Sequence, residues 1–292
     1  MRKKTLQRTD LALESRELSL GDKQEVEGVK YRREEKSGTV IHFLEVLDKT
    51  GEENIGKPIG QYCTIELKEL ARREGESFEN TAYVVAEELL SIMPESKGGT
   101  TLVVGLGNRN ITPDAIGPYA AEATIVTRHL KERLPEDFKF FSPVAVISPG
   151  VLGTSGIESA SYIKSICDDL SPELVIAVDA LAARSLDRLC RTVQISDTGI
   201  TPGSGVENSR AAINSEYLGV PVVAVGVPTV VDIVTILADL EAQQISETQE
   251  SMIVTPRNID SETECAGKLI GYAINLALHK DLSVGDIDMF IA

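Results

Sequence analysis

The chain has 292 residues, 42% of them hydrophobic and 25% charged, so it can bury a substantial core and is not expected to be disordered. Its formal net charge of −16 argues against a direct nucleic-acid partner, because nucleic-acid-binding surfaces gather Lys and Arg. No apolar run approaches the roughly 18 residues that span a membrane, and no apolar core follows the basic N-terminus as in a secretion signal. We therefore expect a cytoplasmic protein with a small-molecule or protein ligand.

Predicted strands and helices alternate along the chain. Short apolar, β-branched runs predict strands, and apolar residues at every third or fourth position predict helices. Strands are predicted at Thr39–Leu47, Gln61–Leu67, Leu102–Val104, Pro143–Ile147, Leu174–Val178, Thr192–Ile195 and Pro221–Val225. Helices are predicted at Asn80–Met93, Pro118–Leu134, Ile157–Leu170, Val230–Ala242 and Gly267–His279, with loops at Thr50–Gly60 and Gln243–Glu250. This order predicts a three-layer αβα fold, in which helices cover both faces of a twisted, mostly parallel sheet.

Two aspartates follow predicted strands. Asp114 lies in the loop that leaves the strand near Gly105, and Asp179 directly ends the strand Leu174–Val178. Because parallel strands open their carboxyl ends on one edge of a sheet, the two side chains can converge. Two close carboxylates resist ionising together, and the shared proton makes one an acid and the other a base that activates water. Such a pair suits peptide hydrolysis, whereas capping of the following helix or turn is the structural alternative.

Other site chemistries have weaker support. Gly105 and Gly107 resemble the start of a dinucleotide-binding loop, but Asn110 occupies the place of the third glycine. Structural roles are expected for the three histidines, which lie in a predicted strand, within a helix and at a helix end. They are His42, His129 and His279. The four cysteines are widely spaced, without a Cys-x-x-Cys pair, which is typical of free thiols in a reducing compartment.

Further polar residues stand near the predicted strand ends. Asp197 and Thr198 lie in the glycine-rich loop SDTGITPGSG, which forms a turn or lines a substrate groove and offers N–H groups to a carbonyl oxygen. Arg184 and Arg188 are expected on a helix beyond Asp179. They either recognise an acidic substrate side chain or face solvent as ordinary helix charges.

Several long motifs occur in a fixed order over most of residues 8 to 280. These motifs are GLGNRNITPDAIGP, TRHL, ISPGVLGTSGIES, DALAARS, QISDTGITPGSG and GVPTVVDIVTI. In them the chain resembles the germination proteases, endopeptidases of bacterial spore formers that degrade small acid-soluble spore proteins. The resemblance implies an atypical aspartic protease without the pepsin fold or a cofactor, a homotetramer, and a place in the forespore or spore core. It puts the proposed catalytic aspartates at Asp114 and Asp179, and we add a substrate groove at Asn108, Asp197, Thr198 and Arg184.

The glycine-asparagine loop and the pair Asp179-Ala180 also resemble hydrogenase maturation endopeptidases, whose phosphorylase/hydrolase-like fold the family shares. Those enzymes recognise nickel with acidic residues and a histidine, and QISDTGITPGSG carries no histidine. A carboxylate pair is therefore favoured over a metal site. The alternatives are a metal-dependent maturation endopeptidase and a non-catalytic nucleotide-binding α/β module. The germination proteases also carry an extra helical segment after Leu240, where this chain is shorter.

The resemblance further implies a zymogen that removes its own N-terminus. Family members cut after an acidic residue in a Thr/Ser-Glu-hydrophobic-Ala-x-Glu context, and residues 8 to 14, RTDLALE, are similar, with Asp in place of Glu. We predict self-cleavage between Asp10 and Leu11, which releases residues 1–10 as a pro-segment from a single protease domain, 11–292. The decapeptide is basic, which suits docking over an acidic cleft or, alternatively, a frayed terminus.

Overall fold

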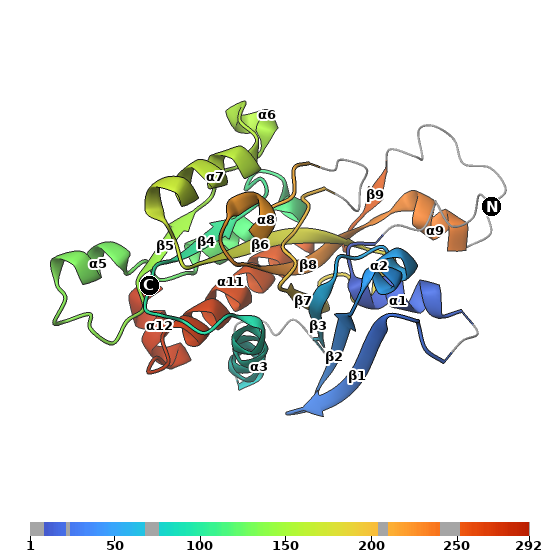
Figure 1. The fold of residues 1–292 in the computed structure, drawn as a ribbon, viewed down its shortest axis with the longest axis horizontal. Helices are drawn as coiled ribbons and strands as arrows, with labels where there is room; N and C mark the ends of the chain where they lie inside the picture. Colours follow the sequence, from blue (N-terminus) through green and yellow to red (C-terminus); the bar gives the residue numbers. More distant parts are fainter. Residues whose placement is uncertain (1–8, 22–23, 68–75, 204–209, 240–251, 292) are drawn as a thin grey trace.

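The computed structural model describes residues 9–21, 24–67, 76–203, 210–239 and 252–291. Within these residues nine strands form one sheet in the order β1-β2-β3-β7-β8-β6-β4-β5, with β9 paired to β8 (Figure 1). The strands are β1 (Val29–Lys36), β2 (Thr39–Val46), β3 (Gly60–Glu66), β4 (Thr101–Gly105), β5 (Val144–Ile147), β6 (Leu174–Ala183), β7 (Thr192–Ser196), β8 (Val222–Asp232) and β9 (Ile253–Val254).

The α/β class is confirmed, and parallel pairing occupies one half of the sheet. Strands β5, β4, β6 and β8 run parallel. Strands β1, β2, β3 and β7 pair antiparallel and join β8 in the same way, so the sheet is less parallel than predicted. The tight turn at Ser37 and Gly38, both with positive φ, requires an antiparallel hairpin between β1 and β2. Strand β1 was not predicted. Its residues are mostly charged and almost all exposed, so the sequence lacks the apolar pattern of a strand.

Helices cover both faces of the parallel half, as the three-layer prediction requires (Figure 1). On one face α3 (Glu76–Ile92), α4 (Ile116–Glu122) and α11 (Ile259–Leu278) enclose the main core, and α11 contacts both others. On the other face α7 (Ser159–Leu170) and α8 (Ser215–Leu218) pack over β4, β6 and β8. The remaining α-helices of the described residues are α1 (Ala12–Leu20), α2 (Lys49–Ile55), α5 (Arg128–Arg133), α6 (Leu152–Ser155), α9 (Ile233–Asp239) and α12 (Val284–Ile291).

Several predicted helices differ from the observed ones. The segment Pro118–Leu134 forms two helices, α4 and α5, because the chain between them bonds elsewhere: Asn275 Oδ1 accepts from the N–H of Ile125 at 2.8 Å. A helix, α2, occupies much of the predicted loop Thr50–Gly60. The carboxylate of Asp48 caps it at 3.0 Å from the Gly51 nitrogen.

The C-terminal part of the chain also departs from the prediction. Strand β8 continues to Asp232, so the predicted helix from Val230 begins later, as α9, and its last residues lie outside the described part. The predicted polar loop Gln243–Glu250 and residues 1–8 lie outside it as well. Among the described residues, no helix is both long and apolar enough to cross a membrane. The four cysteines are free thiols.

Candidate active site

Unequal strand lengths place Asp179 beside the loop that carries Asp114. Strand β4 ends at Gly105, opposite Val178, and the N–H of Leu106 makes the last bond to the Val178 carbonyl at 2.8 Å. Strand β6 continues past this point, so Asp179 lies within the strand and not at its end as predicted. The continuation follows from β8, whose long apolar run pairs with β6 as far as Ala183. Asp179 therefore has a strand, β8, on one side and the β4 loop on the other.

Close backbone packing fixes the loop that carries Asp114. Gly107 has φ +106°, and a Cβ there would lie 2.1 Å from the Asp114 carbonyl oxygen, so this position requires glycine. The N–H of Asn108 donates to that carbonyl at 3.0 Å. From the sheet, the hydroxyl of Thr229 in β8 donates to the Pro113 carbonyl at 2.7 Å. These contacts hold Asp114 against β6 and β8.

Asp114 and Asp179 line the same cavity, of about 360 Å³, which we call the aspartate cavity. Asp179 is 4% exposed, and Asp114 is partly buried. Polar and charged residues line it together with apolar residues of β6 and β8. The polar and charged ones include Asp10, Asp114, Asp179, Arg210, Ser159 and Thr229. Two carboxyl groups remote in sequence thus meet at one partly enclosed site.

Burial sets the protonation of the two carboxyl groups. It raises the pKa of Asp114 to about 6, although the N–H of Asn108 and the charge of Arg210 both favour the ionised form. Burial raises the pKa of Asp179 well above its ordinary value, and the nearby charge of Asp114 adds to this effect. The N–H of Ala180, which donates to Asp179 at 2.9 Å, opposes it only in part. Both carboxyl groups therefore favour their protonated forms more than exposed aspartates do.

Arg210 is a charged site residue that the sequence analysis did not select. It lines the aspartate cavity, and its charge lowers the pKa of Asp114. Its Nη1 is buried and meets no hydrogen-bond partner within the described part of the chain. The sequence places Arg210 shortly after the glycine-rich loop. Nothing else in the sequence distinguishes it from an exposed surface arginine.

Comparison with known proteins identifies the family. A family model for germination proteases matches residues 5–245. The germination protease of Caldanaerobacter subterraneus subsp. tengcongensis is 42% identical over 97% of this chain and 98% of its own length. The chain belongs to the germination protease family. It is accordingly a peptidase.

Two further germination proteases agree with this assignment. The germination protease of Clostridium perfringens is 40% identical over 97% of this chain and 98% of that protein. The one from Bacillus cereus is 43% identical over 80% of this chain and 65% of that longer protein. Among solved structures, the NiFe hydrogenase maturation protease HycI from Thermococcus kodakarensis matches 65% of this chain and 98% of its own, at 19% identity and a TM-score of 0.36.

The four predicted groove residues of this peptidase have different surroundings. Thr198 lines a second cavity, of about 250 Å³, beside the aspartate cavity. The carboxylate of Asp197 accepts from the N–H of Gln61 at 2.8 Å and joins the glycine-rich loop to β3. Asn108 contributes its N–H to Asp114, while its side chain accepts from the N–H of Asn110 at 3.0 Å.

The arginines beyond Asp179 are not on a helix. Arg184 directly follows β6, and its N–H donates to the carboxylate of Glu14 at 2.6 Å. Arg188 ends a single 3-10 turn, and its guanidinium binds Glu17 at 2.7 and 2.9 Å. The helical prediction was wrong because β8 extends the strand through ALAA, although these residues favour helix on their own.

The predicted cleavage position lies at the aspartate cavity. Asp10 lines it, and the negative charge of Asp10 raises the pKa of Asp179. The N–H of Asp10 donates to the Ala182 carbonyl at 2.9 Å, and the Asp10 carboxylate accepts from the N–H of Ala182 at 2.8 Å. Leu11 is fully buried against apolar residues of β6 and β8. The chain on both sides of the Asp10–Leu11 peptide bond is thus ordered against β6.

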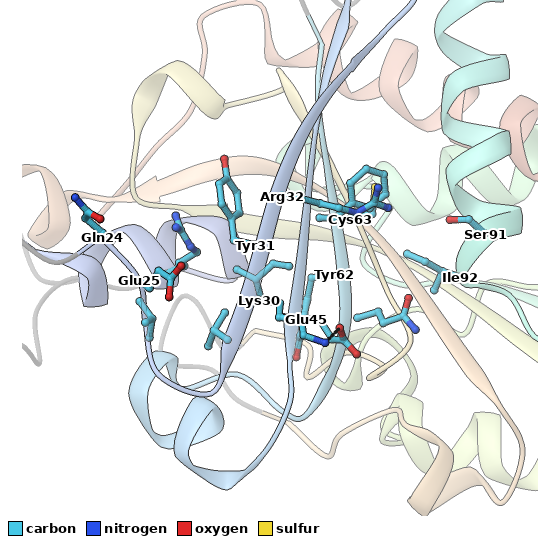
Figure 2. Close-up of a pocket in the computed structure, with 16 residues that line it drawn as sticks. Gln24, Glu25, Lys30, Tyr31, Arg32, Glu45, Tyr62, Cys63, Ser91 and Ile92 are labelled. Atoms are coloured by element: carbon cyan, nitrogen blue, oxygen red, sulfur yellow. Dashed lines mark ion pairs between the residues drawn. The ribbon is translucent and has the colours of Figure 1, made fainter.

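A larger cavity, of about 670 Å³, lies beside strands β1, β2 and β3 (Figure 2). It shares no lining residue with the aspartate cavity. Two arginines that line it stack on aromatic rings, with Arg16 over Tyr31 at 3.8 Å and Arg32 over Phe43 at 3.7 Å.

Among the residues that the structure describes, no cluster of three or more His, Cys, Asp or Glu side chains is placed to hold a metal ion.

Proposed function

We propose that this chain is an endopeptidase that hydrolyses small acid-soluble spore proteins during spore germination, with Asp114 and Asp179 activating water. Membership of the germination protease family supports the peptidase activity and the physiological setting. The observation that carries the aspartate mechanism is the pair of carboxyl groups, both with raised pKa values, that line one cavity. Raised pKa values in a cleft are typical of catalytic acids and bases.

The unequal burial of the pair suggests how the two carboxyl groups divide the chemistry. Above pH 6 the Asp114 carboxylate acts as the general base and takes a proton from the attacking water. Asp179, whose pKa burial raises well above its ordinary value, serves as the general acid and delivers its proton to the leaving amide nitrogen as the C–N bond breaks. The products are a carboxylic acid and an amine, and transfer of a proton from Asp114 to Asp179 restores the pair.

We further propose that the chain is made as a zymogen and removes residues 1–10 by cutting between Asp10 and Leu11. Residues 11–292 then form the mature protease domain. Residues 9 to 14 are held against β6, and Asp10 lies at the aspartate cavity. This arrangement supports cleavage within one chain. Assembly as a homotetramer in the forespore or spore core, without a metal cofactor, completes the proposal and rests on the family resemblance.

Incubation of the purified chain with a small acid-soluble spore protein tests this function. We expect the chain to acquire Leu11 as its N-terminus, and the spore protein to be cut after acidic residues. Both products are identified by N-terminal sequencing and mass spectrometry, with the exposed-surface variant Lys49→Met as the control for handling losses. An unprocessed chain that leaves the spore protein intact would contradict the proposal, and a mature N-terminus other than Leu11 would refute the cleavage position.

A further inference from the structure

Two side chains from separate elements hold the predicted scissile carbonyl group. The Nζ of Lys57, between α2 and β3, donates to the carbonyl oxygens of Thr9 and Asp10, at 3.0 Å each. The Nε2 of Gln194, in the middle of β7, donates to the same Asp10 oxygen at 3.2 Å. The carbonyl that precedes the predicted cleavage point therefore accepts one hydrogen bond from the amino group of Lys57 and one from the amide of Gln194.

Gln194 also fixes the chain beyond the predicted cleavage point. Its Oε1 accepts from the N–H of Ala12 at 2.7 Å, so one amide group binds the chain on both sides of Leu11. Gln194 is 8% exposed, and both contacts require the same orientation of its amide. On the opposite side, the paired bonds between Asp10 and Ala182 fix the register against β6. The peptide bond is therefore held in one position.

Asp10 lies between two cavities, one lined by carboxyl groups and the other by hydrogen-bond donors. Asp10 lines the aspartate cavity with Asp114 and Asp179, and it also lines the second cavity with Lys57 and Gln194. Carboxyl groups that act on water thus lie on one side of this residue, and hydrogen-bond donors to its carbonyl oxygen lie on the other. Peptide hydrolysis needs both, because negative charge develops on the carbonyl oxygen when water attacks the carbon.

We propose that Lys57 and Gln194 are catalytic residues that bind the oxygen of the scissile carbonyl and stabilise its charge during self-cleavage at Asp10–Leu11. The inference rests on the proposed function and adds the groups that bind the oxyanion. Water adds to the Asp10 carbonyl carbon while the C=O electron pair moves to the oxygen, which Lys57 and Gln194 hold. The pair returns as the C–N bond breaks, and the Leu11 nitrogen leaves with the proton of Asp179.

Burial and two nearby carboxylates act in opposite directions on the charge of Lys57. Burial lowers its pKa, and the carboxylates of Asp10 and Glu14 oppose this effect. The hydroxyl of Tyr62, which lines the same cavity, donates to the Pro58 carbonyl at 2.8 Å. A buried ammonium group directed at carbonyl oxygens acts with little screening by water, so it stabilises a developing negative charge more than an exposed lysine would.

The test compares first-order rates of self-cleavage in the full chain and in Lys57→Met, Lys57→Arg, Gln194→Met and Asp179→Asn variants. We expect Lys57→Met and Gln194→Met each to slow cleavage by about 100-fold, as removal of an oxyanion donor typically does. Lys57→Arg should recover most of the rate, and the rate should persist to higher pH because a guanidinium stays protonated. Lys49→Met, at an exposed lysine in α2, should cleave like the parent.

The variants distinguish a failure of the oxyanion assignment from a failure of the proposed function. Lys57→Met and Gln194→Met variants that cleave at the parent rate, while Asp179→Asn is inactive, would overturn the oxyanion assignment and leave the aspartate mechanism standing. A parent chain that never cleaves itself would overturn both. Thermal unfolding of each variant identifies any loss of fold. If Lys57 only anchors the segment, Lys57→Met should lose rate and stability together, and Lys57→Arg should leave the pH profile unchanged, which would also contradict the proposal.

Discussion

Replacement of Asp114 or Asp179 by Asn is expected to slow peptide cleavage by about 10³-fold, within the range that general acid–base groups contribute. Asparagine has the same shape but neither accepts a proton from water nor delivers one to the leaving nitrogen. Because the two carboxyl groups act as a unit, the double variant should be little slower than either single one. The rates to measure are those of self-cleavage at Asp10–Leu11 and of spore-protein digestion.

Asp187→Asn is a matched control, because this exposed carboxylate lies just past β6 and outside the aspartate cavity. The Asn variants at positions 114 and 179 should also remain folded. A carboxyl group whose pKa is raised by folding costs stability as pH rises from its unfolded value, by about 1.4 kcal/mol per pH unit up to the folded pKa. Asp179→Asn should therefore be more stable than the parent at neutral pH. Near-normal cleavage in either variant would remove that residue from the mechanism.

Glu14→Ala is expected to lower the free energy of unfolding by about 3 kcal/mol, the range for breaking a buried charged contact. Glu14 is 2% exposed, and its carboxylate accepts from the backbone N–H groups of Arg184 at 2.6 Å and Ser185 at 2.9 Å. It also lies 3.4 Å from the guanidinium of Arg188. Removal of the carboxylate leaves these donors unpaired and loosens α1 from the end of β6. Denaturant-induced unfolding measures the loss.

Glu17→Ala provides the comparison. Glu17 binds the same Arg188 side chain at 2.7 Å, but it is 44% exposed, so its removal should cost no more than about 1 kcal/mol. Equal losses for the two variants would show that burial of Glu14 is not what matters. An unchanged stability of Glu14→Ala would contradict the anchoring role of this carboxylate.

The two aspartates could be selected from the sequence because their signal is local. Asp114 follows a glycine-rich strand end, and Asp179 follows a continuous apolar run, which marks a strand buried on both faces. The parallel arrangement of β4 and β6 then brings them to one cavity. The helices α3 and α7 were predictable for a similar reason, since each keeps one apolar face at helical spacing. Helix α11 was predictable from a longer apolar run, which is buried without a gap from Leu269 to Leu278.

Features that depend on tertiary contacts could not be predicted. Nothing near Lys57 or Gln194 in the sequence indicates that both side chains bind the Asp10 carbonyl, because the contacts join segments far apart in the chain. Strand β6 extends beyond Asp179 only because β8 pairs with it. Arg210 lines the aspartate cavity because of where the fold places it, and composition does not specify that position. Local patterns therefore indicated the acids of the site but not the cations and amides around them.

An NMR pH titration of the chain, labelled with ¹³C at the aspartate carboxyl carbons, measures most directly whether Asp114 and Asp179 form one proton-sharing pair. With signals assigned from the Asn variants, Asp114 should titrate near pH 6, and Asp179 should titrate well above the ordinary range of an aspartate. Asp114→Asn should lower the midpoint of Asp179, because a neighbouring negative charge is then lost. Ionisation of both groups at about pH 4, as for exposed aspartates, or an Asp179 midpoint indifferent to Asp114→Asn, would contradict the pair.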